Sequence, residues 1–152
     1  MFICIFFPYS MLAQTFQKEE KIKFDGCLLS ATYETNKEGA ILNIPFVSLI
    51  GFNIKIYGEE FPVLYGTPKQ VLKKIEEWQT IFESLDKNDG LVYKAEDGFS
   101  FTYVHYSFPL ASVYEVRFPT GEATTFGEKD LNNYAKALKK WRKKKNIPIA
   151  EE

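Results

Sequence analysis

The fold of this chain is decided by residues 98–126, which read GFSFTYVHYSFPLASVYEVRFPTGEATTF. Aromatic and β-branched residues fill this stretch, and Pro109, Thr120 and Gly121 interrupt it, which is typical of strands joined by turns. The best amphipathic helix of the chain follows directly. Because a sheet buries one face against another layer, we expect the helix to cover one face of these strands.

The N-terminal half repeats this pattern of strands and turns. Apolar and β-branched runs predict strands over residues 22–33, 40–49, 52–57 and 61–65. Residues 35–39 are predicted to form the hairpin loop between the first two of these strands. We interpret Gly26 as a bulge or bend within the first strand, and Gly51 as a break before the fourth segment. Because Phe52, Ile54 and Ile56 alternate with polar residues, they are predicted to form a buried face.

Two amphipathic helices are predicted. Thr67 can cap the first helix, Pro68 suits its first position, and Gln70 can accept a hydrogen bond from the N–H of the cap. Thr125 and Glu128 are predicted to form a similar cap for the second helix. The apolar stripes of the two helices are Val71, Leu72, Ile75, Trp78, Phe82 and Leu85, and Leu131, Tyr134, Ala135, Leu138 and Trp141.

These elements predict an α+β fold. We expect a mostly antiparallel, twisted sheet of seven or eight strands, with helices near residues 68–85 and 128–144 packed on one face. Each half has about four strands and then a helix that reaches Trp78 or Trp141, so the sequence allows a ββββα duplication. No linker-like composition separates the halves, and we therefore expect them to share one sheet. We recognise no family signature in these motifs.

The N-terminal residues divide the chain further. Residues 1–13 form an uncharged apolar leader, residues 14–21 a flexible lead-in, residues 22–147 a single α+β domain, and residues 148–152 a loose tail. The leader has the short apolar run, helix breaker and small residue of a secretory signal, and a start upstream of Met1 would supply its missing basic region. A buried strand and a membrane anchor are the alternatives, although the run is too short to span a bilayer.

The ability of the cysteines to form a disulfide depends on whether the leader is cleaved. If the leader is cleaved, Cys4 leaves with it and Cys27 has no partner for a disulfide. The mature protein is then periplasmic or extracellular and depends on its core for stability, whereas an uncleaved chain is cytoplasmic. Aromatic residues make up 16% of the sequence, which is ample for such a core.

The charge is uneven along the chain. The net charge is −1, yet residues 136–145 contain seven Lys and Arg residues and no acid. This helix end can bind phosphates or anionic headgroups, or it can be a solvated terminus whose cations complement the helix dipole. We favour the second interpretation and expect no nucleic-acid partner and no stable membrane span in the mature chain.

Few residues suggest catalysis. His105 is the only histidine, and with Cys27 it can form a thiolate–imidazole pair only if the fold brings the two together. We favour a strand histidine and a core thiol instead. Residues 86–90 resemble the start of a calcium loop but lack its bidentate Glu, and no ligand spacing indicates another metal. We expect no metal, no cofactor and no catalytic residue.

The aromatic residues give the best binding candidates. Tyr on the face of a sheet offers a large contact surface at low entropic cost for a partner or a sugar, although Tyr is also a good strand residue. The weak candidates for binding are Tyr93, Tyr103, His105, Tyr106 and Tyr114.

Three classes of function are compatible with the sequence. We favour a small exported, non-catalytic binding or interaction module for a protein or small ligand. The first alternative is a cytosolic domain that binds a protein or an anion through the basic helix. The second is a small hydrolase using Cys27 and His105. The sequence does not indicate the identity of the ligand or the oligomeric state.

Overall fold

The structure is a computed structural model that describes residues 15–107 and 110–145. The predicted leader and the loose C-terminal tail lie outside the described residues, so their interpretation stays a prediction.

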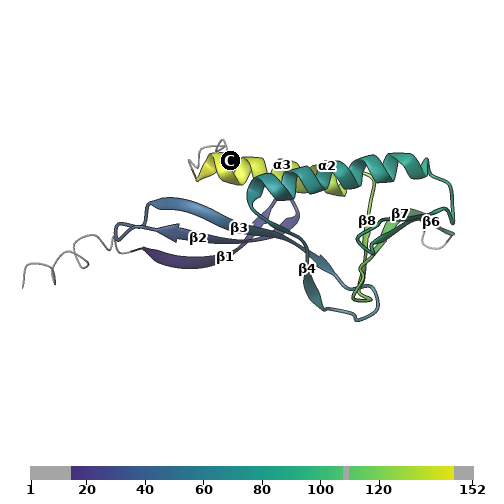
Figure 1. Ribbon diagram of the computed structural model, residues 1–152, viewed down its shortest axis with the longest axis horizontal. Helices are drawn as coiled ribbons and strands as arrows, with labels where there is room; N and C mark the ends of the chain where they lie inside the picture. The colour runs from purple at the N-terminus through teal and green to yellow at the C-terminus, as the bar shows by residue number, and fades with distance from the viewer. Residues whose placement is uncertain (1–14, 108–109, 146–152) are drawn as a thin grey trace, which may run out of the picture.

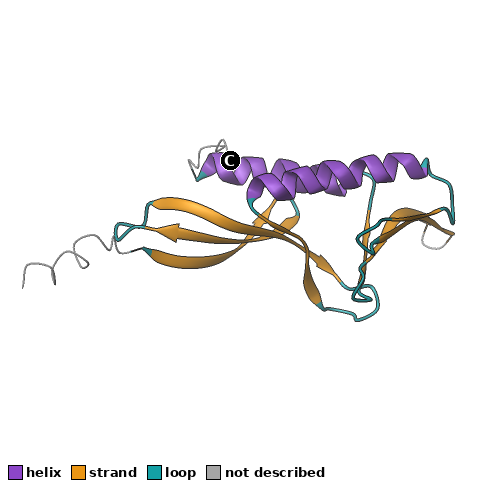
Figure 2. Ribbon diagram, in the orientation of Figure 1, coloured by secondary structure: helices purple, strands orange, loops and turns teal. Residues whose placement is uncertain are grey.

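The described strands form two antiparallel sheets (Figures 1 and 2). Sheet A contains β1 (Phe16–Phe24), β2 (Cys27–Thr35), β3 (Ile41–Phe52) and β4 (Glu60–Gly66), in that order. Sheet B contains β5 (Val92–Lys94), β6 (Ser100–Ser107), β7 (Leu110–Arg117) and β8 (Ala123–Phe126), in that order. The predicted α+β class and antiparallel pairing are confirmed.

The expectation that all strands share one sheet is wrong. Helix α2 (Pro68–Leu85) separates β4 from β5, and its 18 residues carry the chain about 27 Å along the helix axis. The second sheet therefore starts far from the edge of the first. The sheets meet near one hydrogen bond, which the backbone N–H of Ile54 donates to the carbonyl of Ala123 at 2.9 Å.

Each half has four described strands followed by a helix, and each helix contacts the sheet of the other half. Figure 1 shows α2 and α3 (Asp130–Lys144) lying side by side on the same side of the sheets. Helix α2 contacts β3 and β4 of sheet A and also β5 and β6 of sheet B, whereas α3 contacts β2 of sheet A. Neither half therefore buries its own sheet with its own helix alone.

The start of α2 agrees with the prediction. The hydroxyl of Thr67 accepts a hydrogen bond from the N–H of Gln70, and the side chain of Gln70 accepts one from the N–H of Thr67. Pro68 occupies the first helical position, where no N–H is required. This capping box fixes the direction in which α2 leaves β4.

The buried side of α2 carries an aromatic cluster. Trp78 packs against the rings of Phe99, Phe101, Phe118 and Phe126, all of which come from sheet B or the residues flanking its strands. One turn further along α2, Phe82 stacks on Tyr114 of β7 with ring centroids 4.2 Å apart. The core of sheet B is therefore built on a helix that follows sheet A.

The first hairpin differs from the prediction. Residues 16–24, most of which were assigned to a flexible lead-in, form β1 and pair with β2 along their whole length. Gly26 is a turn residue and not a bulge, because Asp25 and Gly26 have φ angles of 49° and 81°. Positive φ at both central residues is the conformation of a two-residue hairpin turn, for which Asp-Gly is a favoured sequence.

Residues 53–59 form a loop and not the predicted strand, while Gly51 lies within β3 and does not interrupt it. The expected buried face does not form, since Phe52, Ile54 and Ile56 are exposed, and of the alternating residues only Asn53, at 6% exposed, is buried. Asn53 closes the loop because its backbone N–H donates to the carbonyl of Glu59 and its side-chain amide donates to the Glu59 carboxylate at 2.6 Å. These local bonds outweigh the apolar alternation.

Helix α3 starts two residues later than predicted, and Thr125 does not cap it. The carboxylate of Asp130 instead accepts a hydrogen bond from the N–H of Gly127 at 2.6 Å, which holds the turn that leads into the helix. Leu131, Leu138 and Trp141 of the predicted stripe are buried. Neither described helix is long and apolar enough to cross a bilayer.

Candidate binding cavity at the junction of the two sheets

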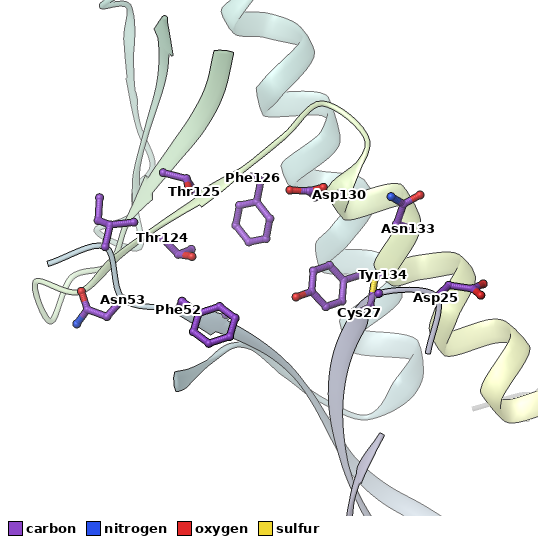
Figure 3. Close-up of a pocket in the computed structure, with 13 residues that line it drawn as sticks. Asp25, Cys27, Phe52, Asn53, Thr124, Thr125, Phe126, Asp130, Asn133 and Tyr134 are labelled. Atoms are coloured by element: carbon purple, nitrogen blue, oxygen red, sulfur yellow. The ribbon is translucent and has the colours of Figure 1, made fainter. Parts of the chain in front are cut away.

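A cavity of about 440 Å³ lies where the two halves meet (Figure 3). The turn between β1 and β2, the end of β3, strand β8 and the start of α3 all contribute to its wall. The rings of Phe52, Phe126 and Tyr134 surround it. Its polar lining comes from Asp25, Cys27, Asn53, Thr124, Thr125, Asp130 and Asn133.

Close packing of backbone against side chains holds the junction together. A Cβ atom on Gly51 would clash with Cγ2 of Val63 and lie 3.2 Å from the hydroxyl oxygen of Thr124. The ammonium of Lys55 donates a hydrogen bond to the carbonyl of Gly121 at 3.0 Å. Only glycine at position 51 allows β3 to approach β4 and β8 this closely, so the residue shapes one wall of the cavity.

Tyr134 ties α3 to sheet A at the edge of the cavity. Its hydroxyl donates a hydrogen bond to the carbonyl of Ile50 at 2.8 Å. Burial raises the pKa of Tyr134 to about 12, and the charges of Cys27 and Asp130 act in the same direction. The phenol therefore stays protonated at neutral pH, and its proton is used in this structural bond.

Two carboxylates, of Asp25 and Asp130, lie in the cavity lining together with the Cys27 thiol. Burial raises the pKa of the Cys27 thiol, and the carboxylates of Asp130 and Asp25 raise it further. The Asp25 carboxylate also forms an ion pair with Lys140 at 2.7 Å, which reduces its effect, whereas the Asp130 carboxylate accepts a bond from a neutral N–H. The thiol is therefore held neutral, and the Asp130 carboxylate lies in the same lining as three aromatic rings.

The proposed Cys27–His105 pair is not assembled in this cavity. Cys27 lies in its wall, but His105 does not. His105 is exposed on β6, where its Nδ1 lies 2.7 Å from the hydroxyl oxygen of Ser112 and its backbone N–H donates to the carboxylate of Asp89. With its raised pKa, the thiol is a poor nucleophile at neutral pH.

The other predicted site residues do not share one surface. Tyr103 and Tyr114 are 7% and 6% exposed, and they pair across β6 and β7 in the core beneath α2. Tyr93 and Tyr106 are exposed but lie on opposite faces of sheet B. Tyr93 pairs with Phe101 and shares its face, whereas Tyr106 lies five residues after Phe101 on the same strand and so points to the other face. Their role in binding stays a prediction, and any such role would involve more than one face of this sheet.

The basic end of α3 takes part in ion pairs with sheet A. Lys140 binds Asp25, and Lys145 lies 3.8 Å from a carboxylate oxygen of Glu20. Arg142 is 3% exposed, whereas Lys143 and Lys144 are exposed. These contacts agree with a helix end that is partly structural and partly solvated.

Sequence reasoning missed the cavity because its lining comes from four separate segments. The one local signal for this part of the fold is the Asp25-Gly26 turn, which places Cys27 at the start of β2. Within residues 15–107 and 110–145, no group of three or more His, Cys, Asp or Glu residues is arranged to hold a metal ion. No protein-family model, curated protein or solved structure matches this chain.

Proposed function

We propose that this chain is a small exported, non-catalytic binding module and that its ligand occupies the junction cavity. The observation that carries the proposal is the cavity itself, which both halves build and which combines aromatic rings with a few polar groups. Its volume of about 440 Å³ suits a small ligand or a side chain of a partner protein. The leader-like residues 1–13 support export.

The chemistry of the lining favours an organic cation. Asp130 supplies the negative charge, and the rings of Phe52, Phe126 and Tyr134 can contact the apolar body of the ligand or the cation itself. The hydroxyl groups of Thr124 and Thr125 add hydrogen-bonding atoms. An amine or guanidinium on an apolar stem therefore fits better than a carboxylate does.

The non-catalytic part of the proposal is supported by the state of the titratable groups. Burial and two carboxylates keep the Cys27 thiol neutral, and the hydroxyl of Tyr134 is held by the Ile50 carbonyl. His105 lies on β6 outside the cavity wall. His105 therefore lies away from a ligand in the cavity, whereas Cys27 and Tyr134 line the cavity but are both held protonated at neutral pH.

The ligand class is tested by NMR titration of the full chain with phenethylamine, agmatine and phenylacetate. We expect the two cations to shift the side-chain amide signals of Asn53 and Asn133, and the carboxylate to leave them unchanged. In Asp130→Asn, the amide oxygen can still accept the bond from Gly127, and we expect the amines to bind about tenfold more weakly. Lys143→Glu is the matched control for a change of charge outside the cavity.

Two results would count against this proposal. Equal affinity of the amines for Asp130→Asn and for the unchanged chain would show that the Asp130 carboxylate does not contribute to binding. Chemical-shift changes confined to residues outside the cavity would show that the amines bind elsewhere. Export is tested separately by mass spectrometry of the N-terminus from native cells, where an intact Met1 would contradict cleavage of a leader.

A further inference from the structure

We propose that the outer edge of β5 binds an extended, basic peptide segment of a partner protein, which adds to sheet B as a further strand. The site is a groove of about 410 Å³ between α2 and β5, lined in part by Trp78, Ile81 and Tyr93. This inference does not depend on the junction cavity, which lies elsewhere in the fold.

The backbone of β5 offers free hydrogen-bonding groups at this edge. In the described chain β5 has only β6 as a neighbour, and Tyr93 pairs with Phe101. The N–H of Ala95 donates to the carbonyl of Phe99, so the odd-numbered residues of β5 face β6. By the alternation of an antiparallel ladder, the N–H and C=O groups of Val92 and Lys94 point away from the sheet.

The other three outer strands are protected against strand addition by charges, a proline or a covering loop, whereas β5 is protected only by its length of three residues and by Lys94. β1 carries alternating charges such as Lys18, Glu19 and Lys21, and β4 contains Pro62. The edge of β8 is occupied at Ala123 by the loop that follows β3. Charged residues, proline and covering loops are the usual protection of an edge strand. In β5 and the residue before it, Leu91, Val92 and Tyr93 are instead 46%, 49% and 44% exposed.

The groove also determines the charge of the peptide. Glu77, Glu96 and Asp97 lie in its lining, and Lys74 is the only cation there. Lys74 lies 3.0 Å from Glu77 and 3.8 Å from Asp97, so it offsets one of the three negative charges. A peptide with apolar side chains toward Ile81 and Tyr93 and a Lys or Arg near Glu96 therefore matches the groove in both polarity and charge.

The test uses two fluorescein-labelled eight-residue peptides, one of alternating valine and lysine and one of alternating valine and glutamate. We expect fluorescence anisotropy to show binding of the lysine peptide only. Val92→Pro removes an outward N–H without removing a bond to β6, and it should weaken binding at least tenfold. Val92→Thr keeps the N–H and should retain the affinity.

Charge reversal gives a second, independent readout. The double variant Glu77→Lys with Glu96→Lys should lose the lysine peptide and gain the glutamate peptide. Hydrogen exchange should slow at the amides of Val92 and Lys94 when the lysine peptide binds. Asp130→Asn, which alters the junction cavity, should bind the peptide normally.

Three outcomes would overturn the inference. Absence of binding by the lysine peptide would exclude this occupant, and unchanged exchange at Val92 and Lys94 in the complex would exclude strand addition. A dimer of the free chain that Val92→Pro abolishes in sedimentation experiments would assign the edge to a second copy of this chain.

Discussion

Replacing Trp78 with alanine should remove the centre of the core of sheet B. The side chain is 2% exposed and contacts four aromatic rings, from Phe99, Phe101, Phe118 and Phe126. Burial of about 150–250 Å² of aromatic surface at about 25 cal/mol per Å² contributes about 4–6 kcal/mol. Measured truncations of buried aromatic residues fall at about 3–5 kcal/mol, so we expect Trp78→Ala to cost about 4–5 kcal/mol.

The measurement is urea denaturation followed by circular dichroism and by the fluorescence of the remaining tryptophan. In Trp78→Ala this reporter is Trp141, which lies on the buried side of α3, the helix that contacts β2. The expected cost corresponds to a decrease in Tm of roughly 8–20 °C for a chain of this size. Trp141→Ala is the matched variant in the other half and should cost about 3–5 kcal/mol.

A loss below about 2 kcal/mol for Trp78→Ala would refute this reasoning, because it would mean that the ring cluster does not hold sheet B on α2. Tyr57→Ala is the control, since Tyr57 is fully exposed and its truncation should change the free energy of unfolding by less than about 0.5 kcal/mol.

Three further predictions concern the junction, the helix end and pH. Gly51→Ala should cost about 1–3 kcal/mol in urea denaturation, and adding Val63→Ala should recover part of that loss only if the clash is with the Val63 side chain. Replacing Lys143 and Lys144 with Glu should cost less than about 1 kcal/mol, and loss of salt-sensitive binding to anionic vesicles in this variant would instead support an anion-binding helix. Because the pKa of Tyr134 is raised to about 12, its contribution to stability is complete below about pH 10 and is lost as the pH rises toward 12. The free-energy difference between the unchanged chain and Tyr134→Phe should therefore shrink over that range, and a constant difference would contradict the shifted pKa.

Sequence reasoning succeeded where the signal is local. Helix α2 has its capping residues and its apolar stripe within one continuous segment, and it begins and ends as predicted. The hairpin between β5 and β6 has a local signal of the same kind, because Asp97-Gly98 is a favoured turn sequence and Gly98 has a φ of 91°. In both cases, neighbours in the sequence supply the interactions that decide the structure.

The errors arose where a polar bond opposes the apolar pattern or where distant residues decide the structure. The alternation in residues 52–57 predicted a buried strand face, but Asn53 bonds to Glu59 and turns the apolar side chains outward. The alternation along the strands does not show whether the face that carries Tyr103 and Tyr114 is exposed or buried. Both are core residues because α2 packs on that face. The junction cavity depends on the approach of β3 to β8, for which no single segment carries a signal.

The contact of α3 with sheet A has a consequence for folding during synthesis. The ribosome completes all of sheet A and α2 before it adds the residues of α3, which contacts β2. Until then, α3 is not available to contact β2, whose buried side chains include Leu29 and Ala31. Before α3 is made, α2 can cover only β3 and β4 of sheet A, and the apolar face of β2 is the surface on which a chaperone would act in the meantime.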